Sequence, residues 1–193
     1  TGDLFNLYVF YEIFSVSAYL LVAFSTMEWQ ATEAGFKYLV FGTVGAMFFL
    51  LGTTYMFMLT GLLNLGAISD ALAMTPGLPL YVPGGCFLIA LSIKAGAFPS
   101  HFWLPDAHSS ARTPVSALLS GVLIMATIYV FIRLFSLFFI AHEPRLFSFM
   151  LITGSLSLVT GHVMAFRQED IKRLLAYSTV AHIGYILIGI GCA

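Results

Sequence analysis

Two residues of opposite charge, Glu12 and Lys94, lie inside apolar runs of the sequence, where a charge is costly. At a helical rise of 1.5 Å per residue, Glu12 lies roughly 12 Å from the start of its run. A charge this deep in a bilayer costs about 2.5–3.5 kcal/mol on insertion scales, and proteins keep it where it pairs with another group or lines a hydrated cavity. We therefore expect Glu12 and Lys94 to form an ion pair within the membrane.

Gly96 and Pro99 follow Lys94 and predict a break in its helix. Pro99 supplies no amide donor and its ring clashes with the preceding turn. Unpaired backbone groups are tolerated at membrane depth only where protein or water satisfies them, so broken helices tend to mark ion sites. Since a desolvated lysine loses its proton readily and a nearby carboxylate opposes that loss, we expect Glu12 and Lys94 to act as a proton switch. The alternative is a static ion pair that only fixes helix packing.

Histidine and hydroxyl side chains supply further candidates for proton transfer. His182 lies in the middle of the last apolar run and is either a proton relay or a packed residue, whereas packing is the expected role of His162. Three hydroxyl residues of one run would bridge water or serve small-residue packing: Ser116, Ser120 and Thr127.

A polar stretch after the break contains His101, Asp106 and His108. These residues lack a third ligand at a recognised spacing, so we expect loop and cap hydrogen bonds here and no metal site. The two cysteines, Cys86 and Cys192, are far apart and match no metal or redox spacing. We therefore expect no cofactor.

The composition places these residues in a membrane protein. Of the 193 residues, 60% are hydrophobic and 9% charged, and the mean hydropathy is +0.96. A soluble fold is excluded by these values. The formal charge of −1 leaves no basic face for nucleic acid, so nucleic-acid binding is excluded as well.

The fold class that follows is an all-α integral membrane protein with one transmembrane domain over residues 1–193. A span needs roughly 20 mostly apolar residues. Six spans meet this requirement, the third broken and continuing as a short segment over about 100–112: 4–24, 36–59, 80–98, 114–139, 146–166 and 171–190.

Basic residues indicate the orientation of the spans, because cytoplasmic loops carry an excess of Lys and Arg. The opposite side offers only Arg133 and Arg145. The side expected to be cytoplasmic holds Lys37, Arg112, Arg167, Lys172 and Arg173. The chain opens at Thr1 without an initiator Met and stops at Ala193 inside an apolar run, so we expect it to be part of a longer protein.

Three segments resemble one known family, and the similarity extends over essentially the whole chain. The family comprises the antiporter-like subunits of respiratory complex I, of membrane-bound hydrogenase and sulfur-reducing complexes, and of multisubunit Na+/H+ antiporters. The segments are residues 3–12 (DLFNLYVFYE), residues 94–117 with FPSHFWLPDAH and TPVSA, and residues 170–178 (DIKRLLAYS).

The resemblance implies an inverted-repeat fold with a broken helix in each repeat, and it places Glu12 and Lys94 at the family's proton-transferring glutamate and lysine. It also implies partners, namely other membrane subunits, the lipid bilayer, and protons or Na+, in the plasma membrane. The family's next proton-carrying position is a lysine or a histidine in the eighth helix, and here this chain departs from the family. The position of that lysine falls at Met125, and the position of that histidine falls at Ser120. Neither of these side chains carries a proton charge.

Three functions follow from these observations. The leading one is a proton-translocating, antiporter-like subunit of a redox-driven complex of the NADH dehydrogenase or hydrogenase type, itself without a catalytic residue. The alternatives are an Na+/H+ antiporter subunit without redox coupling and a non-conducting scaffold subunit, which the apolar Met125 would suit. A quinone-binding redox enzyme has little support, because Trp103 and the histidines form no recognisable quinone site.

Overall fold

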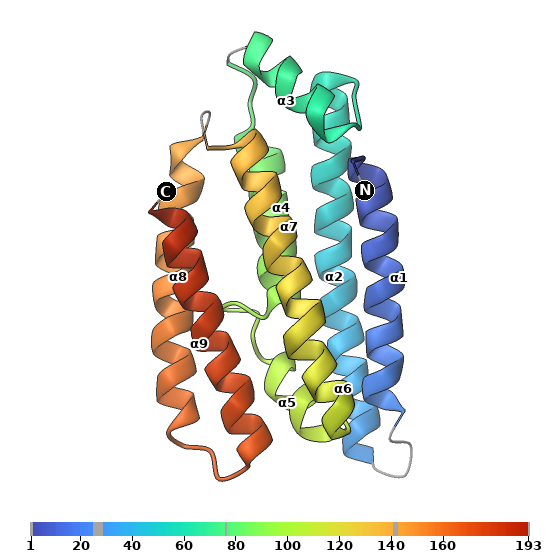
Figure 1. Cartoon of the computed structure of the whole chain (residues 1–193), viewed down its shortest axis with the longest axis vertical. Coiled ribbons are helices and arrows are strands. Elements are labelled where there is room, and N and C mark those ends of the chain that lie inside the picture. The colour runs from blue at the N-terminus through green and yellow to red at the C-terminus, as the bar shows by residue number, and fades with distance from the viewer. Residues whose placement is uncertain (1, 25–28, 76, 141–142, 193) are drawn as a thin grey trace.

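A computed structural model describes residues 2–24, 29–75, 77–140 and 143–192, and these form a bundle of helices (Figure 1). Within these ranges, five helical stretches are long and apolar enough to cross a membrane: Leu4–Ala23, Trp29–Thr60, Thr113–Phe138, Pro144–Ala165 and Ile171–Gly191. Large apolar side chains remain exposed along them, among them Phe10, Leu20 and Val159. Such an outer surface is suited to lipid and not to water.

The first two helices pack side by side at one edge of the bundle. Helix α1 (Leu4–Ala23) begins at Asp3, whose carboxylate accepts a hydrogen bond from the backbone amide of Asn6. Helix α2 (Trp29–Thr60) starts earlier than the predicted residue 36. Its first turns pack against α1, since a Cβ atom added to Gly35 would lie 2.8 Å from Ala23 Cβ, so tertiary packing extends the helix beyond its apolar run.

A short helix, α3 (Leu65–Met74), lies between the second and third predicted spans and was not predicted. The Asn64 side chain caps it by accepting hydrogen bonds from the amides of Gly66 and Ala67. Leu65, Ile68 and Leu72 form its buried stripe. With only one apolar face, α3 lies across the end of the bundle and does not span it (Figure 1).

The predicted break in the third span is confirmed. Helix α4 (Tyr81–Ala95) ends before the predicted residue 98, because Gly96 adopts a left-handed conformation with φ +79° and its amide donates back to Ser92 and Ile93. The chain resumes as α5 (Trp103–Ser110). Protein groups satisfy the interrupted backbone: the Trp103 indole donates to the Ile93 carbonyl at 3.0 Å, and the Phe98 amide donates to the Ser157 hydroxyl at 2.8 Å.

The fourth span is continuous but contains a π-helical segment. Helix α6 (Thr113–Leu118) runs into the π-helix η1 (Leu119–Ile124) and then into α7 (Met125–Phe138). A π-helix is wider than an α-helix and rotates the residues beyond it relative to those before it. This rotation changes which side chains of the span share a face.

The last two helices, α8 (Pro144–Ala165) and α9 (Ile171–Gly191), pack closely at the edge of the bundle opposite α1 and α2 (Figure 1). Glycines allow the close approach: a Cβ atom added to Gly184 would lie 2.6 Å from the Leu158 amide nitrogen and 2.7 Å from the Gly154 carbonyl oxygen. Small residues at such crossings are typical of membrane helix pairs.

Replacing Gly184 with alanine is therefore expected to destabilise the α8–α9 pair by roughly 1–3 kcal/mol, because the new methyl group meets backbone atoms that cannot rotate away. The apparent melting temperature of the purified protein in detergent measures the effect. Gly189→Ala on the same helix is the matched control, since a Cβ atom there meets nothing within 4 Å. Equal melting temperatures for the two variants would contradict this account of the packing.

Candidate functional site

The structure brings Glu12 and Lys94 together as an ion pair between α1 and α4. The Lys94 ammonium donates hydrogen bonds to a Glu12 carboxylate oxygen and, at 2.9 Å, to the Ser15 hydroxyl. The Lys94 side chain is 4% exposed, and that of Glu12 is 25% exposed. The lysine is thus enclosed while its partner retains an opening to the surroundings.

Three features of the sequence position this pair. Glu12 and Ser15 are three residues apart and therefore share a face of α1. Lys94 lies in the last turn of α4, where the unpaired carbonyls of a helix end favour a cation. On α2, Gly45 leaves room for the lysine stem, since a Cβ atom there would lie 3.1 Å from Lys94 Cγ.

Two further residues of the site, Tyr11 and Ser15, were missed by sequence reasoning. The ring centroid of Tyr11 lies 4.5 Å from Lys94 Nζ, and the Tyr11 hydroxyl contacts the hydroxyl of Thr127 on α7. Ser15 could have been found from its helical spacing to Glu12. The contact of Tyr11 with Thr127 joins residues far apart in sequence, so no local pattern reports it.

The three predicted water-bridging hydroxyls do not form one row. Ser116 hydrogen-bonds to His108 Nδ1 at 2.7 Å, whereas Thr127 is buried against Tyr11. Ser120 has only long contacts of 3.4 Å to carbonyls of its own turn. The spacing of these residues fits one face of a regular α-helix, but the π-helix between Ser116 and Thr127 rotates them apart.

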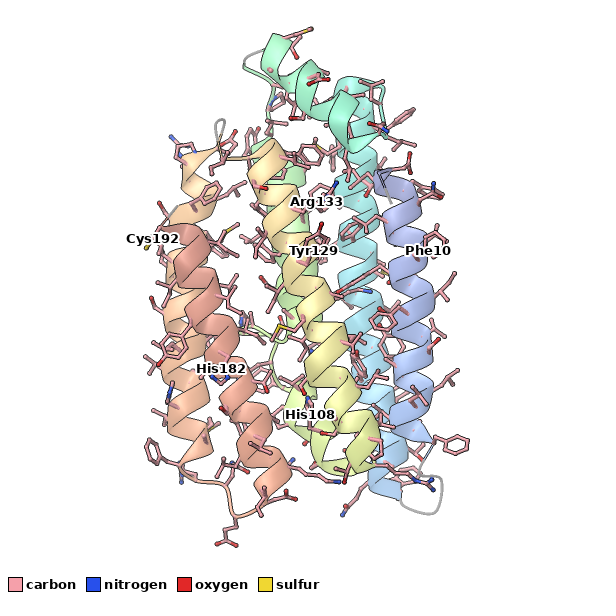
Figure 2. The ribbon with its side chains drawn as sticks, in the orientation of Figure 1. Phe10, His108, Tyr129, Arg133, His182 and Cys192 are labelled. Carbon is pink, nitrogen blue, oxygen red and sulfur yellow. The ribbon has the colours of Figure 1, made fainter. Side chains whose placement is uncertain are left out.

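The predicted relay residue His182 is exposed on α9 and makes no hydrogen bond to another residue of the described ranges. Figure 2 shows it on the side of α7 opposite α1. The structure therefore does not bring His182 into contact with Lys94. His162 is exposed as well, with Nδ1 lying 2.9 Å from the Leu158 carbonyl oxygen of its own helix.

His101 and His108 are buried near the break and do not share a ligand site. The His101 ring stacks on Phe98 and Phe102, and His108 lies on α5 (Figure 2). Within the described part of the chain, no group of three His, Cys, Asp or Glu side chains is arranged to hold a metal ion.

A second charged cluster lies at the end of the bundle that was expected to be cytoplasmic. The Asp106 carboxylate of α5 accepts a hydrogen bond from Lys37 of α2 at 3.0 Å and another from Arg173 of α9. A polar cavity of about 420 Å³ opens beside the cluster, lined also by Gln30, Glu33 and Ser109. Asp106 thereby ties the short helix after the break to two other helices.

Comparison with known proteins gives one family and several relatives. The family model described as "NADH:quinone oxidoreductase/Mrp antiporter, TM" matches residues 1–193. The NADH-quinone oxidoreductase subunit N of Desulforudis audaxviator is 38% identical, over 98% of this chain and 38% of its own length. An Na(+)/H(+) antiporter subunit of Alkalihalophilus pseudofirmus is 34% identical, over 99% of this chain and 39% of its own.

A solved structure is similar to this chain in both fold and sequence. A chain of the membrane-bound sulfane sulfur reductase, an archaeal respiratory membrane complex, superposes with a TM-score of 0.91 at 33% identity, covering 99% of this chain and 39% of that one. The present chain thus spans about two fifths of the length of the relatives it matches.

Replacing Asp106 with asparagine is expected to lower the apparent melting temperature by roughly 1–3 °C, because both ion pairs are lost but their partners are part-exposed and screened by solvent. The difference should shrink at high salt. Asp70→Asn on α3 is the control, since Asp70 is exposed and forms no ion pair with a described residue. A loss that is insensitive to salt would show that Asp106 acts through packing instead.

Proposed function

The chain belongs to the NADH:quinone oxidoreductase/Mrp antiporter transmembrane family, and from this premise we propose that it is part of a proton-translocating, antiporter-like subunit of a redox-driven membrane complex. The family predicted from the three motifs is confirmed, as are the all-α membrane fold and the multi-pass location in the plasma membrane. The proposed partners are other membrane subunits of such a complex, as in the respiratory assembly that contains the structural relative.

The observation that carries the proposal is the Glu12–Lys94 ion pair at the end of the broken helix. A lysine enclosed by protein holds its proton only while a carboxylate or another acceptor faces it. When the pair opens, the ammonium loses that support and releases its proton. When the pair closes, the amine takes up a proton again. Movements of neighbouring subunits that open and close the pair would thus move protons without a redox centre in this chain.

Replacing Glu12 with glutamine or Lys94 with alanine is expected to reduce proton transport by about tenfold or more, because each change removes one half of the switch. The measurement is proton uptake by sealed vesicles containing the assembled complex with the full-length subunit, alongside its electron-transfer rate. Glu169→Gln, an exposed acid in the turn before α9, is the matched control and should transport normally. Normal transport by both site variants would refute the proposal.

A second candidate, an Na+/H+ antiporter subunit without redox coupling, is favoured by the 34% identity to the Na(+)/H(+) antiporter subunit of Alkalihalophilus pseudofirmus. Dependence of transport on sodium in the same vesicles separates the two candidates. A proton pump of a redox complex needs electron transfer and no sodium gradient, whereas an exchanger needs sodium and runs without an electron donor.

The scaffold alternative is supported by Met125, an apolar residue with 51% exposure where the resemblance places a proton carrier. It predicts that substitution of Glu12 or Lys94 changes assembly of the complex and leaves the transport of assembled complexes unaltered. The transport assay per assembled complex therefore also decides this alternative.

A further inference from the structure

Tyr11 lies where α1, α4 and α7 meet, and it is 7% exposed. Its ring covers the Lys94 ammonium, with Nζ 4.5 Å from the ring centroid. Its hydroxyl reaches Thr127 on α7. Tyr11 thus connects the ammonium to α7.

The orientation of the Tyr11 ring is fixed from two directions. Phe49 of α2 stacks beside it, with ring centroids 6.3 Å apart and planes inclined by 24°. The Thr127 hydroxyl donates its hydrogen to the Leu123 carbonyl at 2.9 Å, so its oxygen is left to accept from the Tyr11 hydroxyl. Tyr11 therefore has little freedom to leave the ammonium.

This arrangement completes the surroundings of the ammonium. Glu12 and Ser15 accept two of its hydrogen bonds, and the Tyr11 ring face offers the negative part of an aromatic quadrupole to the same charge. Among the described residues, Glu12 and Tyr11 are the titratable groups that contact Lys94. Beside the lysine stem, helix α2 contributes the uncharged Gly45, and α7 reaches the site through the neutral Thr127.

We propose that Tyr11 is a positioning residue for proton transfer at Lys94, holding the ammonium against Glu12 through its ring and tying that ring to α7 through its hydroxyl. The inference rests on the proposed function and adds a residue to the same site. Because the ring face attracts the ammonium, removal of the ring loosens the hold on the Lys94 side chain. Because the hydroxyl joins Thr127, a displacement of α7 reaches the ammonium through Tyr11.

The test measures proton transport against pH in sealed vesicles with the full-length subunit in its complex. Tyr11→Leu removes ring and hydroxyl, and we expect about a tenfold fall in transport and a pH profile displaced from that of the wild type. Tyr8→Leu is the matched control: Tyr8 stacks on the same Phe49 one turn away on α1 and does not contact Lys94. It should leave the pH profile in place.

Tyr11→Phe and Thr127→Val each remove the hydroxyl contact and keep the remaining bulk. We expect each to give a smaller and equal loss, with no further loss in the double variant, because both remove the same interaction. Tyr11→Phe should also restore most of the pH profile lost in Tyr11→Leu. A purely structural role would lower the amount of assembled complex and leave the pH profile unmoved.

The possible outcomes distinguish the role of Tyr11 from the proposed proton transfer by Glu12 and Lys94. If Lys94→Ala abolishes transport while Tyr11→Leu keeps the wild-type pH profile, the role of Tyr11 is overturned and the proton-transfer function stands. If Lys94→Ala itself transports normally, the proposed function fails first. Additive losses in the Tyr11→Phe and Thr127→Val double variant would overturn the link to α7.

Discussion

The cost of holding one ammonium group inside an apolar bundle sets most of the local structure. Lys94 is 4% exposed, so water does not stabilise its charge, and the surrounding protein must do so instead. Glu12 supplies the opposite charge, Ser15 an acceptor and Tyr11 a ring face, all from one helix, α1. Ser15 lies one turn beyond both Tyr11 and Glu12, so α1 presents the three groups together. The chemistry of this site is thus a property of how α1 faces α4.

The break after Lys94 is possible because the protein replaces the lost helical hydrogen bonds. Gly96 turns the chain out of α4, and the Phe98 amide donates a hydrogen bond to the Ser157 hydroxyl on α8. The Trp103 indole satisfies the Ile93 carbonyl and stacks on Tyr38 at a centroid distance of 4.1 Å. The interruption is therefore held by side chains from three other helices. It is an ordered feature of the bundle, and it ends α4 directly beside the charged pair.

Residue type and depth were enough to predict the pairing of Glu12 with Lys94, since few partners exist for a charge in hydrocarbon. The same was true of the broken helix, because Gly96 and Pro99 act on their own neighbours. Local patterns could not report Tyr11 or the double contact of Asp106, since these depend on which helices become neighbours. The sequence also did not predict the π-helix η1, because its effect on the relative orientation of Ser116 and Thr127 cannot be read from residue types alone.

The carboxylate of Asp106 has a mechanical consequence. Its two cationic partners belong to helices in different packed pairs, Lys37 with the α1–α2 pair and Arg173 with the α8–α9 pair. The short helix α5 is thereby linked by ion pairs to both helix pairs at one end of the bundle. Any displacement of one pair relative to the other at this end therefore has to lengthen or break one of the two ion pairs that share the Asp106 carboxylate.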